Sequence, residues 1–186
     1  MGLPFTYRRC RQVGSLAATR IRVRLLIELD PVLAALATLP RGERLLGLDI
    51  GTKTIGLAMS DVERRLATPL ETISRGKFAK DAERIAALVQ RYRIGGLVAG
   101  LPVNMDGSEG PRAQATRAFM RNLARLLPLP ISFWDERLST AAVQRALIEA
   151  DASRARRAEV IDRMAAAYIL QGAIDRIRAS TEDHTT

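Results

Sequence analysis

The chain of 186 residues is 47% hydrophobic and 26% charged, which is ordinary for one soluble globular domain with a substantial core. Its net charge is +9 and nearly all of its basic residues are arginines. This favours a phosphate-rich partner, because guanidinium groups bind phosphate in a bidentate way. Only 4% of the residues are aromatic, which argues against binding of single strands by base stacking. The single cysteine, Cys10, excludes a disulfide within the chain, and no stretch reaches the roughly 20 apolar residues of a membrane span. We therefore expect a cytoplasmic protein.

The beginning of the chain differs in charge from the rest. No acidic residue occurs before Glu28, whereas residues 1–27 contain six arginines. This segment fits a disordered basic arm, an Arg-rich targeting sequence or sequence translated upstream of the true start. We interpret residues 1–28 as a poorly ordered or mis-started extension, residues 29–180 as the folded domain and residues 181–186 as a polar tail.

The predicted elements begin with a short helix after Asp30, a suitable N-cap that precedes a proline at the first helical position. Two adjacent strands, Leu45–Ile50 and Thr54–Ser60, follow, with a tight Gly-Thr-Lys turn between them. A third apolar stretch at 66–73 contains Pro69 and is therefore expected to be an edge or bulged strand. These three strands should form an antiparallel meander.

After the meander, helices and strands alternate. The amphipathic spacing of apolar residues predicts the helices, and short apolar runs predict the strands. The expected elements are a helix at 78–93, a strand at 94–102, a loop at 103–110, a helix that ends at Pro128, a strand at 131–134, a helix from Ser139 or Thr140 to about 150, a polar basic loop at 151–157 and a last helix at 159–179. This order predicts an α/β fold with a mixed five-stranded sheet flanked by helices on both faces, as in the ribonuclease H-like architecture.

One carboxylate stands out in the first strand. Side chains alternate between the faces of a strand, so Asp49 shares its face with Gly47 and Gly51. A charged group in an apolar strand is costly to bury without a partner. We expect the two glycines to leave space that a metal ion or a phosphate fills. The alternative is an aspartate that hydrogen-bonds to the turn that follows.

Two further acids can converge on Asp49. Glu136 follows the fifth strand, and Asp162 is expected in the first turn of the last helix, where the helix dipole alone would also favour an acid. Folds of this class bind ligands outside the carboxyl ends of their strands. Three converging carboxylates repel one another unless a cation lies between them, and Mg²⁺ or Mn²⁺ prefers such oxygen ligands. The only histidine, His184, lies in the polar tail, so histidine-based catalysis is disfavoured.

Four segments in series resemble the YqgF-type (RuvX) family of RuvC-like, ribonuclease H-fold proteins, whose members are described as pre-16S rRNA nucleases and Holliday-junction resolvase homologues. The segments, which lie between about residues 44 and 178, are LGLDIGTKTIGLAMSD, GLPVNMDGSEG, DERLSTAAV and DASRARRAEVIDRMAAAYILQ. The resemblance implies a RuvC-type fold and an acidic site for Mg²⁺ or Mn²⁺ made by Asp49, Glu136 and Asp162. RuvC-type resolvases carry a fourth carboxylate one helical turn beyond the helix acid, where this chain has Ala165.

Other residues receive supporting roles. The basic loop that contains Arg154, Arg156 and Arg157 is placed to hold nucleic-acid phosphates, and the alternative is a solvated run of charge. Lys53 follows Asp49 and either contacts a phosphate or is a plain turn lysine. In the loop after the fourth strand, we predict that Asn104, Asp106 and Ser108 orient a water or a metal ligand. The alternative is that Ser108 caps the next helix and that Gly107 supplies a positive φ.

The prediction is a metal-dependent endonuclease that hydrolyses phosphodiester bonds, with 5′-end processing of pre-16S rRNA as the function that the resemblance implies. Junction DNA is the rival substrate, and a non-catalytic RNA-binding factor of ribosome assembly is a further alternative. The segment DIGTKTIG also resembles the phosphate-binding hairpin of the actin, Hsp70 and sugar-kinase superfamily. Those enzymes need two such domains to clamp ATP, and this chain has one hairpin. The expected partner is nucleic acid rather than a membrane, and the chain is a monomer or a homodimer.

Overall fold

The computed structural model describes residues 31–136 and 154–182. The predictions for the extension at 1–28, for the helix at 139–150 and for the end of the tail with His184 lie outside the described residues. The elements, in chain order, are α2 (Pro31–Ala37), β1 (Arg44–Ile50), β2 (Thr54–Ser60), β3 (Ala67–Ser74), α3 (Phe78–Tyr92), β4 (Ile94–Leu101), α4 (Pro111–Leu126), β5 (Ile131–Asp135) and α6 (Arg154–Glu182).

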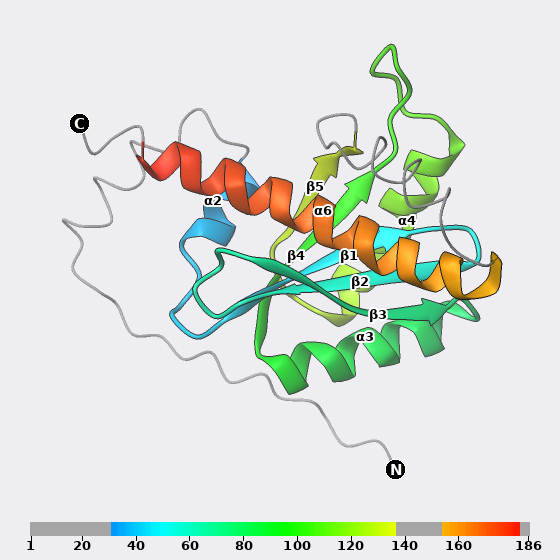
Figure 1. The fold of residues 1–186 in the computed structure, drawn as a ribbon, viewed down its shortest axis with the longest axis horizontal. Coiled ribbons are helices and arrows are strands. Elements are labelled where there is room, and N and C mark those ends of the chain that lie inside the picture. Colours follow the sequence, from blue (N-terminus) through cyan, green and yellow to red (C-terminus); the bar gives the residue numbers. More distant parts are fainter. Residues whose placement is uncertain (1–30, 137–153, 183–186) are drawn as a thin grey trace.

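The strands form one mixed sheet in the order β3-β2-β1-β4-β5. β1, β2 and β3 pair antiparallel, and β4 joins β1 and β5 in parallel. The predicted meander and the five-stranded mixed sheet are therefore confirmed. Because β1, β4 and β5 run in the same direction, their carboxyl ends meet at one edge, and the turn between β1 and β2 lies at that edge as well (Figure 1).

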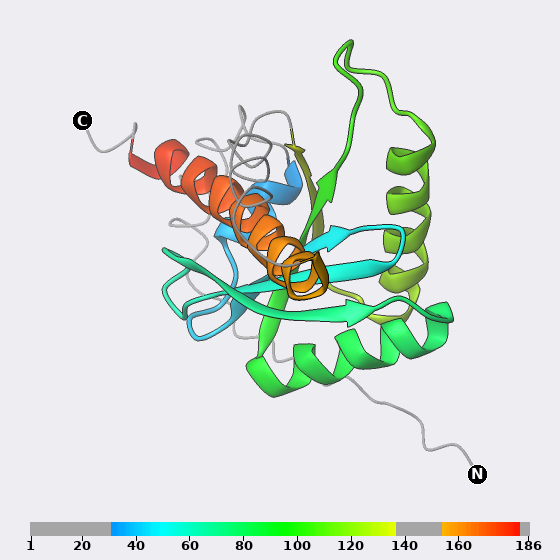
Figure 2. The ribbon, with the colours of Figure 1, turned by 45° about the vertical axis from the view of Figure 1, so that its right-hand side comes forward.

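The alternation of side chains along the strands creates two cores, one on each face. On one face, Leu46, Leu48 and their neighbours pack against α3 and α4. On the other face, Leu45 and Val98 pack against α6 and α2. Figure 2 shows α6 on one side of the sheet and α3 and α4 on the other. None of the helices in the described part of the chain combines the length and the apolar character that a membrane crossing requires.

β3 is the edge strand that its proline predicts. Its pairing with β2 shifts register between Leu57 and Ala58, where Leu57 faces Glu71 and Ala58 faces Pro69. The extra residue forms a bulge, and the proline costs no ladder hydrogen bond inside the sheet because β3 has a neighbour on one side only.

α6 is longer than expected. It begins at Arg154 and ends at Glu182, whereas we predicted a helix at 159–179 after a loop at 151–157. The prediction of a loop was wrong from Arg154 onward. Arginine and alanine are both strong helix formers, and their propensity prevails over the polarity that suggested a loop.

Candidate active site

Asp49 lies one residue before the end of β1, half-buried, on the face of the sheet that α6 covers. It is directly opposite Gly56 of β2. On its other side, the pairing of Leu48 with Ala99 continues by one residue and places Gly100 of β4 beside it. Asp49 is therefore flanked on both neighbouring strands by residues without a side chain.

We expected Gly47 and Gly51 to leave space for a ligand, and this expectation was wrong. A Cβ at Gly47 would lie 2.7 Å from the Cβ of Leu170 and 2.8 Å from the carbonyl oxygen of Ala166, so α6 fills the space above it. A Cβ at Gly51 would lie 3.0 Å from the carbonyl oxygen of Thr54, within the turn. Neither glycine leaves room for a ligand. The flanking glycines on β2 and β4 instead admit the backbone of α6 and the carboxylate of Glu136.

Asp162 approaches Asp49 from α6. A Cβ at Gly56 would overlap the carbonyl group of Asp162 and lie 2.9 Å from the backbone nitrogen of Arg163. The backbone of α6 therefore rests directly on β2, opposite Asp49. The Oγ1 atom of Thr54, the first residue of β2, donates a hydrogen bond of 2.6 Å to Oδ2 of Asp162. This bond fixes the carboxylate at the edge of the sheet.

We expected Asp162 in the first turn of its helix, and this expectation was wrong. α6 begins eight residues earlier, at Arg154, and the effect of the helix dipole fades beyond the first turn. The dipole therefore does not account for an acid at this position. Thr54 is the partner that the structure provides.

Glu136 approaches from the other side. It follows β5 directly and is half-buried. A Cβ at Gly100 would lie 2.8 Å from Oε1 of Glu136. The carboxylate therefore occupies the space that the glycine leaves beside Asp49. The structure brings all three predicted acids to one face and one edge of the sheet.

The three carboxylates do not form a closed cluster. Among residues 31–136 and 154–182, no three acidic, histidine or cysteine groups lie close enough together to hold a metal ion as they stand. Like charges keep apart when no cation lies between them. The donor atoms are nevertheless all carboxylate oxygens, which is the set that suits Mg²⁺ or Mn²⁺. The residues therefore fit such an ion in the type of their donor atoms.

The chain is similar to known proteins of one family. The family model described as "RuvX: Holliday junction resolvase" matches residues 43–176. The chain belongs to the RuvX family. A RuvX-family relative from Methylocella silvestris, named "Putative pre-16S rRNA nuclease", is 64% identical over 141 residues, which cover 76% of this chain and 88% of the relative. A relative of the same name from Paramagnetospirillum magneticum is 64% identical over 148 residues, covering 78% and 96%. The predicted family is confirmed.

Among solved structures, the fold of this RuvX-family chain is similar to that of RuvC from T. thermophilus in complex with a Holliday junction substrate. The TM-score is 0.50 at 13% identity, and the match covers 74% of this chain and 97% of RuvC. At this identity the likeness concerns the fold alone. Together with the strand order β3-β2-β1-β4-β5, it confirms the predicted ribonuclease H-like, RuvC-type fold.

Ala165 stands one helical turn after Asp162 and is buried, with 2% of its surface exposed. A carboxylate at this position would need space that the structure does not offer. In this member of the RuvX family, Asp162 is therefore the acid that α6 brings to the site.

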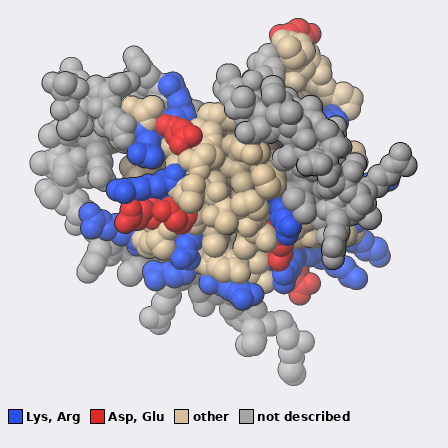
Figure 3. All heavy atoms as spheres, viewed as in Figure 1, with Lys and Arg blue, Asp and Glu red and all other residues tan. Residues whose placement is uncertain are grey.

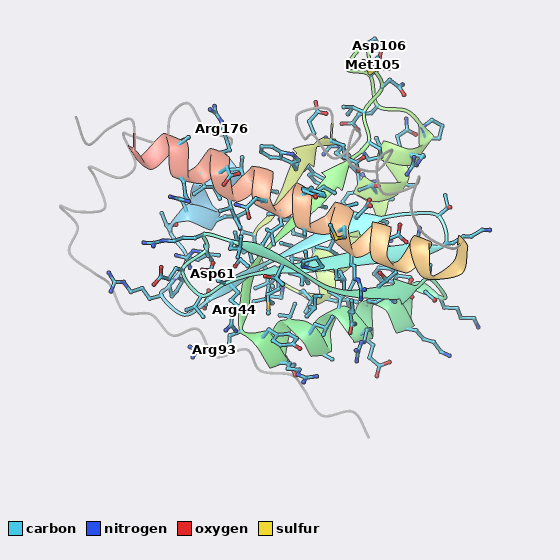
Figure 4. All side chains as sticks on the ribbon, viewed as in Figure 1. Arg44, Asp61, Arg93, Met105, Asp106 and Arg176 are labelled. Carbon is cyan, nitrogen blue, oxygen red and sulfur yellow. The ribbon has the colours of Figure 1, made fainter. Side chains whose placement is uncertain are left out.

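The loop between β4 and α4 rises beyond the sheet (Figure 2). Its three predicted site residues bond to one another: Nδ2 of Asn104 donates to Oγ of Ser108 (2.9 Å), and Oγ and the backbone N–H of Ser108 both donate to Oδ1 of Asp106 (2.6 and 2.9 Å). Figure 4 places Asp106 at the tip of the loop, away from the sheet. The structure therefore does not bring these residues to the carboxylates.

The structure also tests the alternative roles of Gly107 and Ser108 in this loop. Gly107 adopts a positive φ of 85°, as expected of a tight turn. The cap of α4 is Gly110, without a side-chain hydrogen bond, so the expectation that Ser108 caps this helix was wrong.

The base of the loop is held by an ion pair. Nη2 of Arg117, on α4, donates to Oε1 of Glu109 at 2.6 Å, and the guanidinium lies 4.6 Å from the ring centroid of Phe133. Hydrogen bonds from Arg117 lower the pKa of Glu109 below its ordinary value of 4.5. Because a lowered pKa means that folding favours the charged form, this pair stabilises the loop fully above pH 4.5 and is lost as the pH falls through the lowered pKa.

This ion pair predicts a signal in nuclear magnetic resonance. We expect the Nε–H resonance of Arg117 to keep its bonded position until the pH falls below 4.5. A Glu109→Gln substitution should shift it already at neutral pH. The Nε–H resonance of Arg84, which donates to Glu71 at 2.8 Å, is the internal control and should not move in the variant. An unchanged Arg117 resonance in Glu109→Gln would contradict the assignment.

The predicted phosphate-binding residues lie near the same edge. Lys53 is exposed in the turn between β1 and β2. Arg154, Arg156 and Arg157 belong to the first turn of α6 rather than to a loop, so that part of the prediction was wrong. The start of α6 lies at the side of the molecule where β1 and β2 meet their turn (Figure 1).

Sequence reasoning missed Thr54, Gly56 and Gly100. A local signal existed for the glycines, because an isolated glycine inside a strand often marks close approach of another backbone. The hydrogen bond of Thr54 joins residues 108 positions apart. No local pattern reveals a contact of that separation.

Proposed function

We propose that this RuvX-family protein is a cytoplasmic, divalent-metal-dependent nuclease that hydrolyses phosphodiester bonds in the 5′-end processing of the 16S rRNA precursor. The observation that carries the proposal is the convergence of Asp49, Glu136 and Asp162 on one face at one edge of the sheet. The substrate is the one in the names of the relatives from M. silvestris and P. magneticum.

Asp49, Glu136 and Asp162 would hold Mg²⁺ or Mn²⁺. Such an ion supplies an activated water and neutralises charge that develops on phosphate oxygens. The chain's own residues prepare the place for it. Thr54 orients Asp162. Gly56 lets the backbone of α6 approach β2, and Gly100 gives room to the carboxylate of Glu136.

The surrounding charges suit a polyanion. Lys53 and the arginines at the start of α6, Arg154, Arg156 and Arg157, would contact phosphates on either side of the bond that is cut. Three carboxylates would repel a nucleic acid that was only bound, so their presence favours a nuclease over a non-catalytic RNA-binding factor.

A second candidate substrate is a four-way DNA junction, because the matching family model is described as a Holliday junction resolvase. Ala165 disfavours this candidate. RuvC-type resolvases carry a carboxylate at that position, and here the position is buried and apolar.

The test is cleavage of two end-labelled substrates, the 16S rRNA precursor and a four-way DNA junction, with Mg²⁺, with Mn²⁺ and with a chelator. A Glu136→Gln protein purified in parallel controls for contaminating nucleases. We expect metal-dependent cleavage of the precursor at a defined position by the wild type alone. Cleavage of neither substrate, or equal cleavage by the variant, would overturn the proposal. Cleavage of the junction alone would mean that the substrate of the nuclease is branched DNA and not the rRNA precursor.

Thr54 gives a separate prediction for the metal site. A Thr54→Val substitution removes the hydroxyl that orients Asp162 while keeping the shape of the side chain. Because outer partners of metal ligands typically contribute 10–100-fold to metal affinity, we expect Mn²⁺ to bind about 10-fold more weakly. Calorimetric titration of Mn²⁺ measures this directly.

Thr54→Ser keeps the donor and is the matched control. It should bind Mn²⁺ nearly as tightly as the wild type. Equal Mn²⁺ affinity in the valine and serine variants would show that the hydroxyl does not position Asp162 for metal binding.

A further inference from the structure

The three lysines of this chain lie together. Among 29 basic residues, only Lys53, Lys77 and Lys80 are lysines. Lys53 lies in the turn between β1 and β2, and Lys77 and Lys80 lie at the beginning of α3. All three are exposed. In a chain that otherwise uses arginine, the lysines therefore gather where the turn after Asp49 meets the start of α3.

Arg75 joins the two segments. Its backbone N–H donates to the carbonyl oxygen of Lys53 at 2.8 Å, and its Nη1 donates to the carbonyl oxygen of Gly51 at 2.7 Å. Its guanidinium lies 5.4 Å from the ring centroid of Phe119. That ring in turn packs edge-on against Phe78 of α3, with the centroids 5.3 Å apart. The guanidinium is held against the turn that follows Asp49.

We name Lys53, Arg75, Lys77 and Lys80 the hairpin patch. The ion pairs in the described part of the chain involve other residues, namely Arg65 with Glu63, Arg84 with Glu71 and Arg117 with Glu109. Figure 3 shows basic side chains at the right-hand margin, where β3 leads into α3. All four side chains of the patch are exposed, and within residues 31–136 and 154–182 no ion pair joins them to a carboxylate.

The acid nearest in sequence, Asp81, does not neutralise the patch at its surface. Its side chain is 2% exposed, and its Oδ1 accepts a hydrogen bond of 3.1 Å from the backbone N–H of Gly76. This hydrogen bond fixes the backbone of Gly76, which lies between Arg75 and Lys77. The backbone that carries the exposed charges of the patch is therefore held by hydrogen bonds.

The hairpin patch lies next to the proposed cleavage site but on the other side of the sheet. Phe119 and Phe78 belong to the core with α3 and α4, whereas Asp162 and the start of α6 cover the opposite face. The turn between β1 and β2 separates the two. A ligand that contacts both sides must cross the end of this hairpin.

We infer that a nucleic-acid backbone crosses the end of the β1–β2 hairpin and that the hairpin patch binds its phosphates on the α3 side of the cleavage site. This inference rests on the proposed function for the identity of the ligand. Lysine ammonium groups are compact charges on flexible stems and suit phosphates rather than base edges. The hairpin patch therefore binds the polynucleotide backbone without regard to sequence.

The test uses the full chain with Asp49→Asn as background and no divalent metal, so that binding is measured apart from cleavage. The test variant, Arg75→Gln with Lys77→Gln and Lys80→Gln, removes three charges from the patch. The control variant, Arg41→Gln with Arg91→Gln and Arg176→Gln, removes three exposed charges from the turn before β1, the end of α3 and the later part of α6. The probe is a labelled single-stranded RNA or the duplex formed from it, titrated at salt concentrations from about 50 to 200 mM.

We expect the test variant to bind about 10–100-fold more weakly at the lower salt concentration, and the slope of log K against log salt to fall by about 2. The control variant should keep the affinity and slope of its background. Equal slopes in the test variant and the background would overturn the inference, whether or not the wild type cleaves RNA. If the slope falls in the test variant but the wild type cleaves neither substrate, the inference about the hairpin patch stands and the nuclease proposal is refuted.

Discussion

An Asp49→Asn protein is expected to lose about 10³-fold in metal-dependent cleavage rate and to bind Mn²⁺ much more weakly. The amide is nearly the same size as the carboxylate, and Asp49 is only half-buried, so its place admits the amide as well. The fold should therefore be kept while the central charge of the site is removed. Single-turnover cleavage, Mn²⁺ titration and thermal melting measure the three properties.

Asp175→Asn is the matched control, because Asp175 is exposed on α6 and accepts a hydrogen bond from Gln171 far from the site. It should cleave at the rate of the wild type. If Asp49→Asn also cleaved at that rate with an unchanged melting temperature, Asp49 would not be a metal ligand.

A Gly56→Ala substitution is expected to have the largest effect on stability. An added Cβ would overlap the carbonyl group of Asp162. Such overpacking lowers the free energy of unfolding by about 1–3 kcal/mol. Alanine in place of glycine inside a strand would otherwise gain roughly 0.5–1 kcal/mol. The overlap is with backbone, which cannot rotate away, so we expect a net loss of stability and a displaced Asp162.

Urea unfolding and cleavage rate test this expectation together. Gly76→Ala is the control, because a Cβ there would meet only Oδ1 of Asp81 at an ordinary 3.9 Å. An increase in stability for Gly56→Ala would mean that α6 has room to move off β2, contrary to the packing described above.

The sheet could be predicted from the sequence because its signals are local. The alternation in β1 and β2, the proline in β3 and the buried run of β4 each determine one strand, and the order of strands and helices then limits the topology. The start of α6 could not be predicted in the same way. The segment at 151–157 is polar, and polarity alone does not distinguish a loop from an exposed turn of helix.

The candidate site was predictable only in part. Asp49 and Glu136 follow from their places at the ends of strands, since those ends meet at one edge. The partner of Asp162 does not, because the bond to Thr54 depends on how α6 packs across the sheet. The same packing determines which glycines matter: Gly47 and Gly56 admit the helix, and Gly100 admits the carboxylate of Glu136.

The distance along the chain between β1 and α6 also has a consequence in time. Domains are synthesised from the N-terminus, so Asp49 and its hairpin leave the ribosome before Asp162 does. Until α6 packs against the sheet, Gly56 has no helix above it and Thr54 has no carboxylate to hold. A nascent chain therefore has an incomplete site. The full set of acids is present only after α6 has been synthesised and has packed against the sheet.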